Sequence, residues 1–186
     1  MIDRKENRII EIEIRNLQIL KMHLRKTNYV VLLLLLVFFT ACDKKQFFSE
    51  YKELEGTWKK SDTLRFTFEQ KDTINPYHLF LNVRNNNNYP FNNMYLIVAL
   101  KEPGKKPTIK IDTLEYQMAD ADGTLLGNGF TDVKESKLWY LENYVFTRVG
   151  KYKVEVVQAV RATGEVDGVA ELEGITELGL RIEKTK

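Results

Sequence analysis

Cysteine and histidine are scarce in this sequence of 186 residues, which has one cysteine, Cys42, and two histidines. A single cysteine cannot form a disulfide within the chain, and His78 is the only histidine after residue 41. A zinc site of the H-E-x-x-H type needs two imidazoles, and structural zinc sites need several thiolates or imidazoles. We therefore expect residues 42–186 to hold no disulfide and no zinc site.

A surplus of either charge is also missing. Residues 1–41 hold seven Lys/Arg and four Asp/Glu, which leaves 21 basic and 22 acidic residues in 42–186. This balance gives no electrostatic reason to expect nucleic acid, and no polybasic patch for a membrane surface. The sequence has no G-x-S-x-G elbow, no P-loop and no dinucleotide fingerprint. We expect a protein that is not an enzyme and uses no cofactor.

One acidic stretch, DADG at residues 120–123, raises the question of calcium. In an EF-hand register the first and twelfth ligand places would fall on Met118 and Gly129, so two anionic ligands are missing. Asp-Gly and Gly-Asn-Gly supply turn positions, and a glycine-rich hairpin connection is the better explanation. We expect no metal site here.

The longest apolar run is too short to span a membrane. A spanning helix needs about 20 apolar residues, whereas the uncharged run covers residues 27–42 and its strongly apolar part only 29–39. With basic residues before it and small residues after it, the run is typical of a signal peptide. The alternative is an uncleaved signal anchor with an incidental cysteine, which the short length disfavours.

Residues 39–42, Phe-Thr-Ala-Cys, resemble the lipobox of bacterial lipoproteins, with Phe39 where leucine is usual. The resemblance implies that Cys42 is acylated and becomes the first residue of the mature protein. Met22 opens a complete lipoprotein signal peptide over residues 22–41. We therefore interpret residues 1–21 as an over-extended start and exclude them from the fold prediction.

The remainder of the chain has the pattern of an all-β protein. Residues 42–60 are expected to carry the lipid and form a tether, part of which packs down through its aromatic side chains. From residue 61 the hydrophobic period is two rather than 3.6, and strands are predicted at 63–69, 77–84, 94–101, 108–119, 151–161 and 175–184. The run 94–101 is apolar throughout, as in a central strand covered on both faces. We predict an antiparallel β-sandwich, of immunoglobulin-like or jelly-roll type, over residues 61–186.

Two aromatic segments are candidates for binding a partner. The asparagine-rich segment 82–93 carries Tyr89 and Phe91, and is interpreted as a solvated, turn-forming loop or as a recognition loop for a sugar or a protein. The segment 135–146, also expected as a loop, carries Trp139 and Tyr140. A large aromatic side chain often closes the core of a sandwich, so we expect Trp139 to be buried and Tyr140 to be the exposed member.

A short pattern, Asp-Thr followed by leucine or isoleucine, occurs three times, with its threonine at Thr63, Thr73 and Thr113. It resembles the acceptor sequence for O-glycosylation of exported proteins in Bacteroidota. The alternative is an Asp-Thr turn that leads into a strand. Both interpretations stay open.

Four stretches together resemble the GldH family of gliding-motility lipoproteins from Bacteroidota: YPFNNMYLIV at 89–98, and the segments 112–146, 150–161 and 174–184. The resemblance implies a cell-envelope lipoprotein grouped with the gliding machinery, which is linked to type IX secretion. It transfers the lipid-bearing cysteine to Cys42 and no catalytic residue. The residues after Cys42 lack the acidic run associated with surface export, so we expect an outer-membrane anchor with the domain facing the periplasm.

Three functional hypotheses follow. The first is a non-catalytic, lipid-anchored protein that binds other envelope proteins through aromatic and asparagine-rich loops. The alternative is a carbohydrate-binding lipoprotein, which exposed and coplanar rings at Tyr89, Phe91 and Tyr140 would favour. An envelope hydrolase would need two carboxylates that face one pocket about 5 to 10 Å apart.

The predicted anchor can be tested by replacing Cys42 with serine. If the acyl chains on Cys42 hold the protein at the membrane, the Cys42→Ser variant is released by a high-salt wash that leaves the wild type bound. Fractionation followed by immunoblotting measures this. A variant that still sediments with membranes after the wash would show that lipid on Cys42 is not what retains the protein.

Overall fold

A computed structural model describes residues 21–22, 45–129 and 131–185. The chain divides into two compact units, Met1–Asp43 and Lys44–Lys186, and the fold below is that of the second unit. Residues 23–41 of the predicted signal peptide, and Cys42, lie outside the described residues. Within the described part of the chain, no helix is long and apolar enough to cross a membrane.

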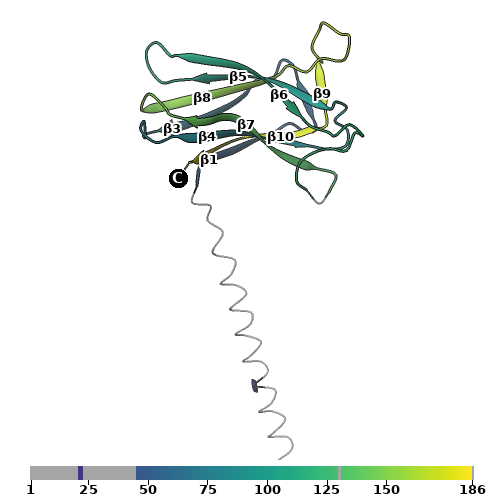
Figure 1. Ribbon diagram of the computed structural model, residues 1–186, viewed down its shortest axis with the longest axis horizontal. Coiled ribbons are helices and arrows are strands. Elements are labelled where there is room, and N and C mark those ends of the chain that lie inside the picture. Colours follow the sequence, from purple (N-terminus) through teal and green to yellow (C-terminus); the bar gives the residue numbers. More distant parts are fainter. Residues whose placement is uncertain (1–20, 23–44, 130, 186) are drawn as a thin grey trace, which may run out of the picture. The chain divides into compact units, whose positions relative to one another are not determined.

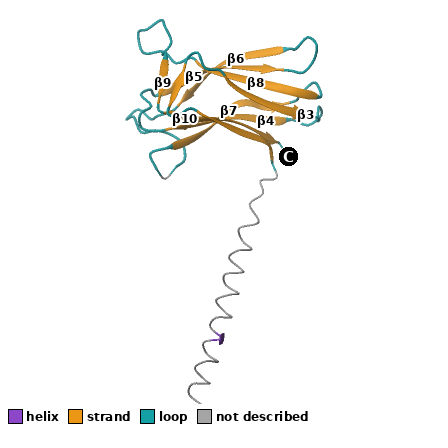
Figure 2. Cartoon of the chain, turned by 180° about the vertical axis from the view of Figure 1, so that it is seen from behind, coloured by secondary structure: helices purple, strands orange, loops and turns teal. Residues whose placement is uncertain are grey.

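The second unit is built from strands in two layers (Figures 1 and 2). One layer, here called sheet I, has the order β1-β10-β4-β7; the other, sheet II, has the order β3-β8-β5-β6; β2 and β9 form a separate pair. The strands are β1 (Gln46–Glu53), β2 (Thr57–Lys59), β3 (Leu64–Gln70), β4 (Tyr77–Asn85), β5 (Asn93–Lys101), β6 (Ile109–Gln117), β7 (Lys134–Tyr144), β8 (Gly150–Gln158), β9 (Glu171–Glu173) and β10 (Ile175–Lys184).

The strand pairing identifies the type of sandwich. All pairings between these strands are antiparallel, and β5 with β6, β4 with β7, β3 with β8 and β1 with β10 form four nested pairs. Successive pairs lie in opposite sheets, as when one long hairpin is rolled up, and the pairs β10–β4 and β5–β8 then complete each sheet. The predicted all-β sandwich is confirmed, and of the two types proposed the arrangement is that of a jelly roll.

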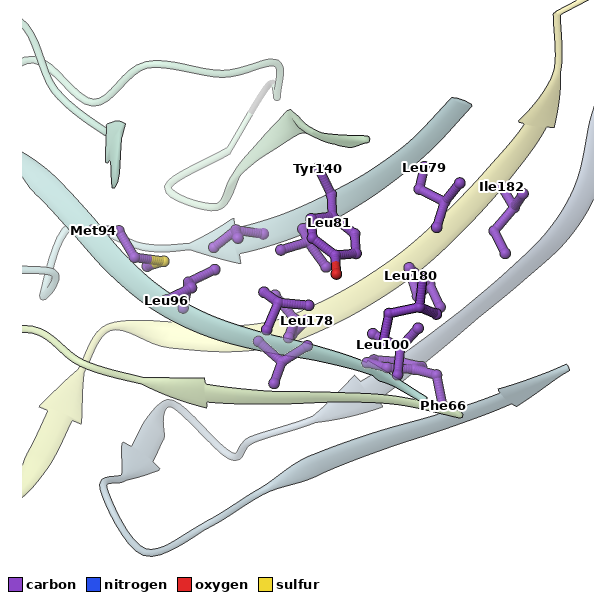
Figure 3. Close-up of a cluster of buried hydrophobic side chains, with 14 of the residues drawn as sticks. Phe66, Leu79, Leu81, Met94, Leu96, Leu100, Tyr140, Leu178, Leu180 and Ile182 are labelled. Atoms are coloured by element: carbon purple, nitrogen blue, oxygen red, sulfur yellow. The ribbon is translucent and has the colours of Figure 1, made fainter. Parts of the chain in front are cut away.

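The core lies between the sheets and follows from the two-residue alternation. In β3, Phe66 and Phe68 are buried while the residues between them face solvent. In β10, Leu178, Leu180 and Ile182 are fully buried and meet side chains from the facing sheet (Figure 3). Burial of each such side chain contributes about 1.5–3 kcal/mol. The pattern read from the sequence therefore specifies which face turns inward in β3 and β10, whereas in β6 the alternating Ile109 and Ile111 lie on the exposed face.

The structure corrects three details of the predicted strands. The sandwich begins at Gln46, since β1 pairs with β10 along its length, so much of the predicted tether belongs to the domain. Strand β5 is covered on one face only by the described residues, and Ile97 on its other face is 36% exposed. The segment expected as a loop at 135–146 is mostly the strand β7.

A close backbone contact fixes the asparagine-rich connection between β4 and β5. Gly174 has φ +80°, and a Cβ atom there would lie 2.2 Å from the backbone nitrogen of Tyr89. The N–H of Asn86 donates to the Gly174 carbonyl at 2.8 Å. The Tyr89 ring is buried, and its hydroxyl donates to the Asn93 carbonyl at 2.7 Å. Only glycine permits this approach, so Gly174 holds the connection against the β9–β10 junction.

We expect Gly174→Ala to lower the free energy of unfolding by roughly 3–5 kcal/mol, because left-handed strain is added to a clash with backbone. Urea denaturation measures this loss. Gly164→Ala is the matched control: Gly164 has φ +84°, and nothing lies within 4 Å of its added Cβ. Gly164→Ala should lower the free energy of unfolding only by the backbone strain, about 1–2 kcal/mol. Equal losses in the two variants would show that the contact with Tyr89 is unimportant.

Candidate interaction surface on sheet I

The outer face of sheet I is built mainly from one side of β4. Leu79, Leu81 and Val83 point into the core and are fully buried. The alternate residues, His78, Phe80, Asn82 and Arg84, therefore lie on the opposite side of the sheet. Phe80 and Asn82 are nevertheless only 4% exposed, because side chains of neighbouring strands cover them.

An aromatic group, here called the Trp139 cluster, comprises His78, Phe80, Lys137 and Trp139. The ring of Trp139 lies 4.4 Å from that of Phe80 and 5.0 Å from that of His78, centroid to centroid. The Nζ atom of Lys137 lies 3.9 Å from the Phe80 centroid and forms an ion pair of 2.7 Å with Glu183. Aromatic pairs contribute about 0.5–1.5 kcal/mol and exposed cation–π contacts about 0.5–1 kcal/mol. These contacts hold Trp139 in place although its side chain is 51% exposed.

A polar group beside it, here called the Arg84 network, comprises Tyr51, Asn82, Arg84, Glu135 and Glu177. Arg84 donates from Nε to Glu135 at 2.6 Å and from Nη1 to Glu177 at 2.7 Å. The Tyr51 hydroxyl donates to Glu135 at 3.2 Å and accepts from the Asn82 amide at 2.6 Å. The guanidinium carbon of Arg84 lies 4.6 Å from the centroid of the Tyr51 ring. The network joins β1, β4, β7 and β10 across the outer face.

A glycine makes room for this network. A Cβ atom on Gly179 would lie 2.7 Å from the Tyr51 ring, so the ring passes directly over β10 to reach Asn82 and Glu135. Burial raises the pKa of Tyr51, and the Glu135 carboxylate adds to this rise. The Arg84 pKa is raised by its hydrogen bond to Glu135. The Tyr51 hydroxyl and the Arg84 guanidinium therefore keep their protons at neutral pH.

Two aromatic residues of β7, Trp139 and Tyr140, have the opposite exposure to that predicted. Trp139 was expected in the core and is on the outer face, whereas Tyr140, expected to be exposed, is buried. Trp139 pairs with outward-facing Phe80, and the pairing register shifts between Leu79 and Phe80. Burial raises the pKa of Tyr140, and the nearby Asp112 carboxylate adds to the rise. Read as a strand, the alternation of Lys137 and Trp139 with Leu138 and Tyr140 would have given the correct assignment.

The structure separates the other two predicted binding residues from this surface. Tyr89 is buried and structural, which removes it from the set of exposed rings proposed to stack on a glycan. Phe91 is half-buried, lies 6.0 Å from the Tyr89 ring, and lines an open hollow of about 780 Å³. The side chain of Asn86 accepts a hydrogen bond from the Asn88 N–H at 2.9 Å, as expected if the asparagines form turns.

The hollow beside Phe91 is mainly polar. Its lining includes Asn92, Gln117, Asp120 and Arg161. It also includes Glu115, whose pKa is lowered by hydrogen bonds from Tyr95 and then Asn93. The described residues include no group of three or more His, Cys, Asp or Glu placed to hold a metal ion. The hollow therefore offers amide and charged groups with one aromatic side chain.

The three threonines of the Asp-Thr pattern lie in different settings. Thr63 precedes β3 and Thr73 lies in the β3–β4 connection, both half-buried, whereas Thr113 is exposed within β6. Before Thr73, the Asp72 side chain accepts from the backbone of Ile74 at 2.9 Å and of Asn75 at 3.1 Å. Hydrogen bonds, the largest from the Asn75 side chain, lower the Asp72 pKa. The turn interpretation therefore accounts for Asp72, but not for Thr113, which lies inside a strand.

The family model described as GldH lipoprotein matches residues 46–182, from the start of β1 to near the end of β10. The chain belongs to the GldH lipoprotein family. The gliding motility lipoprotein GldH of Flavobacterium johnsoniae is 52% identical over 161 residues, 87% of this chain and 99% of that protein. A GldH homolog of Christiangramia forsetii is 48% identical over 150 residues, 81% of this chain and 91% of that protein. The resemblance to the GldH family predicted from the sequence is confirmed.

Solved structures resemble the chain only remotely. The VP2 subviral particle of infectious bursal disease virus aligns with 76% of this chain and 33% of its own, at 13% identity and a TM-score of 0.37. A likeness this low carries no argument about the function of the GldH domain.

The Arg84 network can be tested by Arg84→Met. Since this change leaves two partly exposed carboxylates without their cation, we expect a loss of roughly 1 kcal/mol in the free energy of unfolding, smaller at 1 M salt. Arg65→Met is the control, because the Arg65 side chain is 65% exposed and lies 3.6 Å from Glu155. Urea unfolding of both variants decides the outcome. Equal effects at both positions would contradict a special role for the Arg84 network.

Proposed function

We propose that this GldH-family protein is a lipid-anchored, non-catalytic component of the cell envelope that binds proteins of the gliding or type IX secretion machinery. The outer face of sheet I is its proposed contact surface. The proposed anchor is lipid on Cys42, in the outer membrane, with the domain facing the periplasm. The family membership supports the setting, and the half-exposed Trp139 is the observation that supports the surface.

The Trp139 cluster has properties of a protein-binding anchor. Tryptophan and arginine are enriched among residues that dominate binding energy, and a rigid aromatic side chain loses little entropy when a partner covers it. Trp139 is already held by Phe80 and His78, so docking does not have to order it. The Arg84 network on the same face supplies a polar margin whose charges are paired. A partner with an apolar pocket and a polar rim would complement this arrangement.

Glu115, in the hollow beside Phe91, does not have the pKa that a glycosidase needs in its acid. A glycosidase needs one carboxyl group whose pKa is raised so that it can donate a proton. Glu115, which lines the hollow beside Phe91, has a lowered pKa instead and stays ionised at neutral pH. The hydrogen bonds from Tyr95 and Asn93 that lower its pKa make it a poor general acid.

The hollow beside Phe91 favours a second candidate function, the binding of carbohydrate. Asn92 and Gln117 offer amide side chains, and Phe91 offers part of an aromatic ring. Sugar rings stack on aromatic faces while amides contact their hydroxyl groups, so a glycan is the ligand class for this hollow. This alternative does not involve the Trp139 cluster. The two functions can therefore be separated by variants.

We expect Trp139→Ala to reduce, by at least about tenfold, the recovery of gliding or type IX secretion proteins with the full chain, since truncation of a central anchor costs about 2 kcal/mol or more. The full-length protein is extracted from its native membranes after brief crosslinking, captured by affinity, and its companions are quantified by mass spectrometry. Ile74→Ala is the control, because Ile74 is 83% exposed and lies in the β3–β4 connection, outside the strands that form the proposed surface.

Unchanged recovery with Trp139→Ala would refute the proposed contact surface. Recovery of nothing but abundant, unrelated membrane proteins would refute the proposed role in the machinery. A glycan array probed with the detergent-solubilised full chain tests the second function. Binding that is lost in Phe91→Ala and kept in Trp139→Ala would replace the protein-binding proposal by the carbohydrate alternative.

A further inference from the structure

Strand β6 is an unprotected edge of sheet II. It pairs with β5 over nine residues without a register shift, and it ends the strand order of its sheet. Ile109 and Ile111 on this strand are 48% and 65% exposed. Long, regular, apolar edge strands are the sites where a further strand adds to a sheet, and proteins normally blunt them. The edge of β6 therefore needs an explanation.

In the described part of the chain, the three other edges of sheets I and II are blunted. Strands β1 and β7 have register irregularities, which interrupt a regular ladder. Strand β3 is regular, but its exposed side chains are Arg65, Thr67 and Glu69, and none of them is apolar. Among the four edges of sheets I and II, only β6 combines a regular ladder with exposed isoleucines. It is the edge best suited to accept another strand.

The hydrogen bonds beyond the two ends of β6 show which backbone groups are directed outward. The carbonyl of Thr108 accepts from Glu102, and the N–H of Met118 donates to Asn92, so the even-numbered residues between them bond to β5. The N–H and C=O groups of Ile109, Ile111 and Thr113 alternate with these and point to the free edge. They offer a ready ladder to an incoming strand.

We infer that the occupant of this edge is a second copy of the same chain, paired antiparallel about a two-fold axis at Ile111. In that register Ile111 faces Ile111 of the other copy, and Ile109 faces Thr113. Lys110 of each copy lies opposite Asp112 of the other copy, so each charged side chain faces one of opposite sign. Lys110 and Asp112 already form an ion pair within the chain, and pairing of two copies offers each a second partner of opposite charge.

The dimer has simple geometric consequences. The two-fold contact is isologous and closes, so it stops at two copies rather than growing into a fibre. The two copies of sheet II become one continuous sheet of eight strands, with β6 beside β6 at its centre. On β5, Ile97 and Ala99 lie opposite Thr113 and Ile111 of β6, and they continue the apolar strip on either side of the axis. The backbone groups on this edge gain partners that the single chain does not give them.

We test the inference with Ile111→Cys in the full-length chain, in native membranes under mild oxidation. Residues opposite each other in a hydrogen-bonded antiparallel pair have Cα atoms about 5.5 Å apart, which suits a disulfide. We expect most of the variant to run as a disulfide-linked dimer on a non-reducing gel. The wild type, whose only cysteine is Cys42, gives the background. Thr67→Cys, exposed on the edge strand β3, is the matched control and should stay at that background.

A second experiment needs no crosslink. Ile111→Lys places two ammonium groups opposite each other at the axis. We expect the dissociation constant of the dimer, measured by light scattering of the full chain in detergent, to rise at least tenfold. Ile74→Lys, at a loop position that is 83% exposed, should leave the dimer unchanged. A wild type that is monomeric at all concentrations would overturn the inference, as would Ile111→Cys linked only to a different protein. Neither result depends on Trp139, so the outcome is separate from that of the proposed function.

Discussion

The pairing of β10 with both β1 and β4 is the constraint on which the rest of the structure depends. The last strand of the chain lies between the first strand and a central one, so sheet I is incomplete until the C-terminal residues arrive. Leu178, Leu180 and Ile182 then complete the core, while Gly179 on the opposite face leaves room for the Tyr51 ring. Because these contacts join residues far apart in sequence, loop-closure entropy opposes them, and slow folding is typical of such a topology.

The same pairing creates the candidate interaction surface. Strands β1, β10, β4 and β7 each contribute to the Arg84 network, although they come from four distant parts of the sequence. The outer face of a two-layer sandwich normally carries side chains that stand apart in solvent. Here Phe80 and Asn82 are covered by neighbours on that face, which makes it a small second layer of packing. A fixed surface of this kind is suited to recognition, because little of it has to be ordered on binding.

The sequence predicted much of the fold and little of the surface. Period-two alternation identified β3, β4, β8 and β10, because the alternating apolar side chains of each face the core. It also located β6, but there the alternating Ile109 and Ile111 lie on the exposed face. It did not reveal β7, since clustered aromatic residues there suggested a loop. The size of Trp139 was taken as a sign of burial, whereas its pairing with outward-facing Phe80 decides its exposure. Tyr89 was named as a candidate for recognition beside the turn-forming alternative, because the sequence does not show its close contact with Gly174.

The sequence by itself determined the class of fold, the family, and the absence of an internal disulfide, because each depends on local pattern or composition. The tertiary structure decided the jelly-roll order, the exposed position of Trp139, and which edge strand is left open. These depend on which strands meet, and a one-residue change of register exchanges the two faces of a strand. No local pattern records that choice. It is made when β10 enters sheet I and the two sheets close over one core.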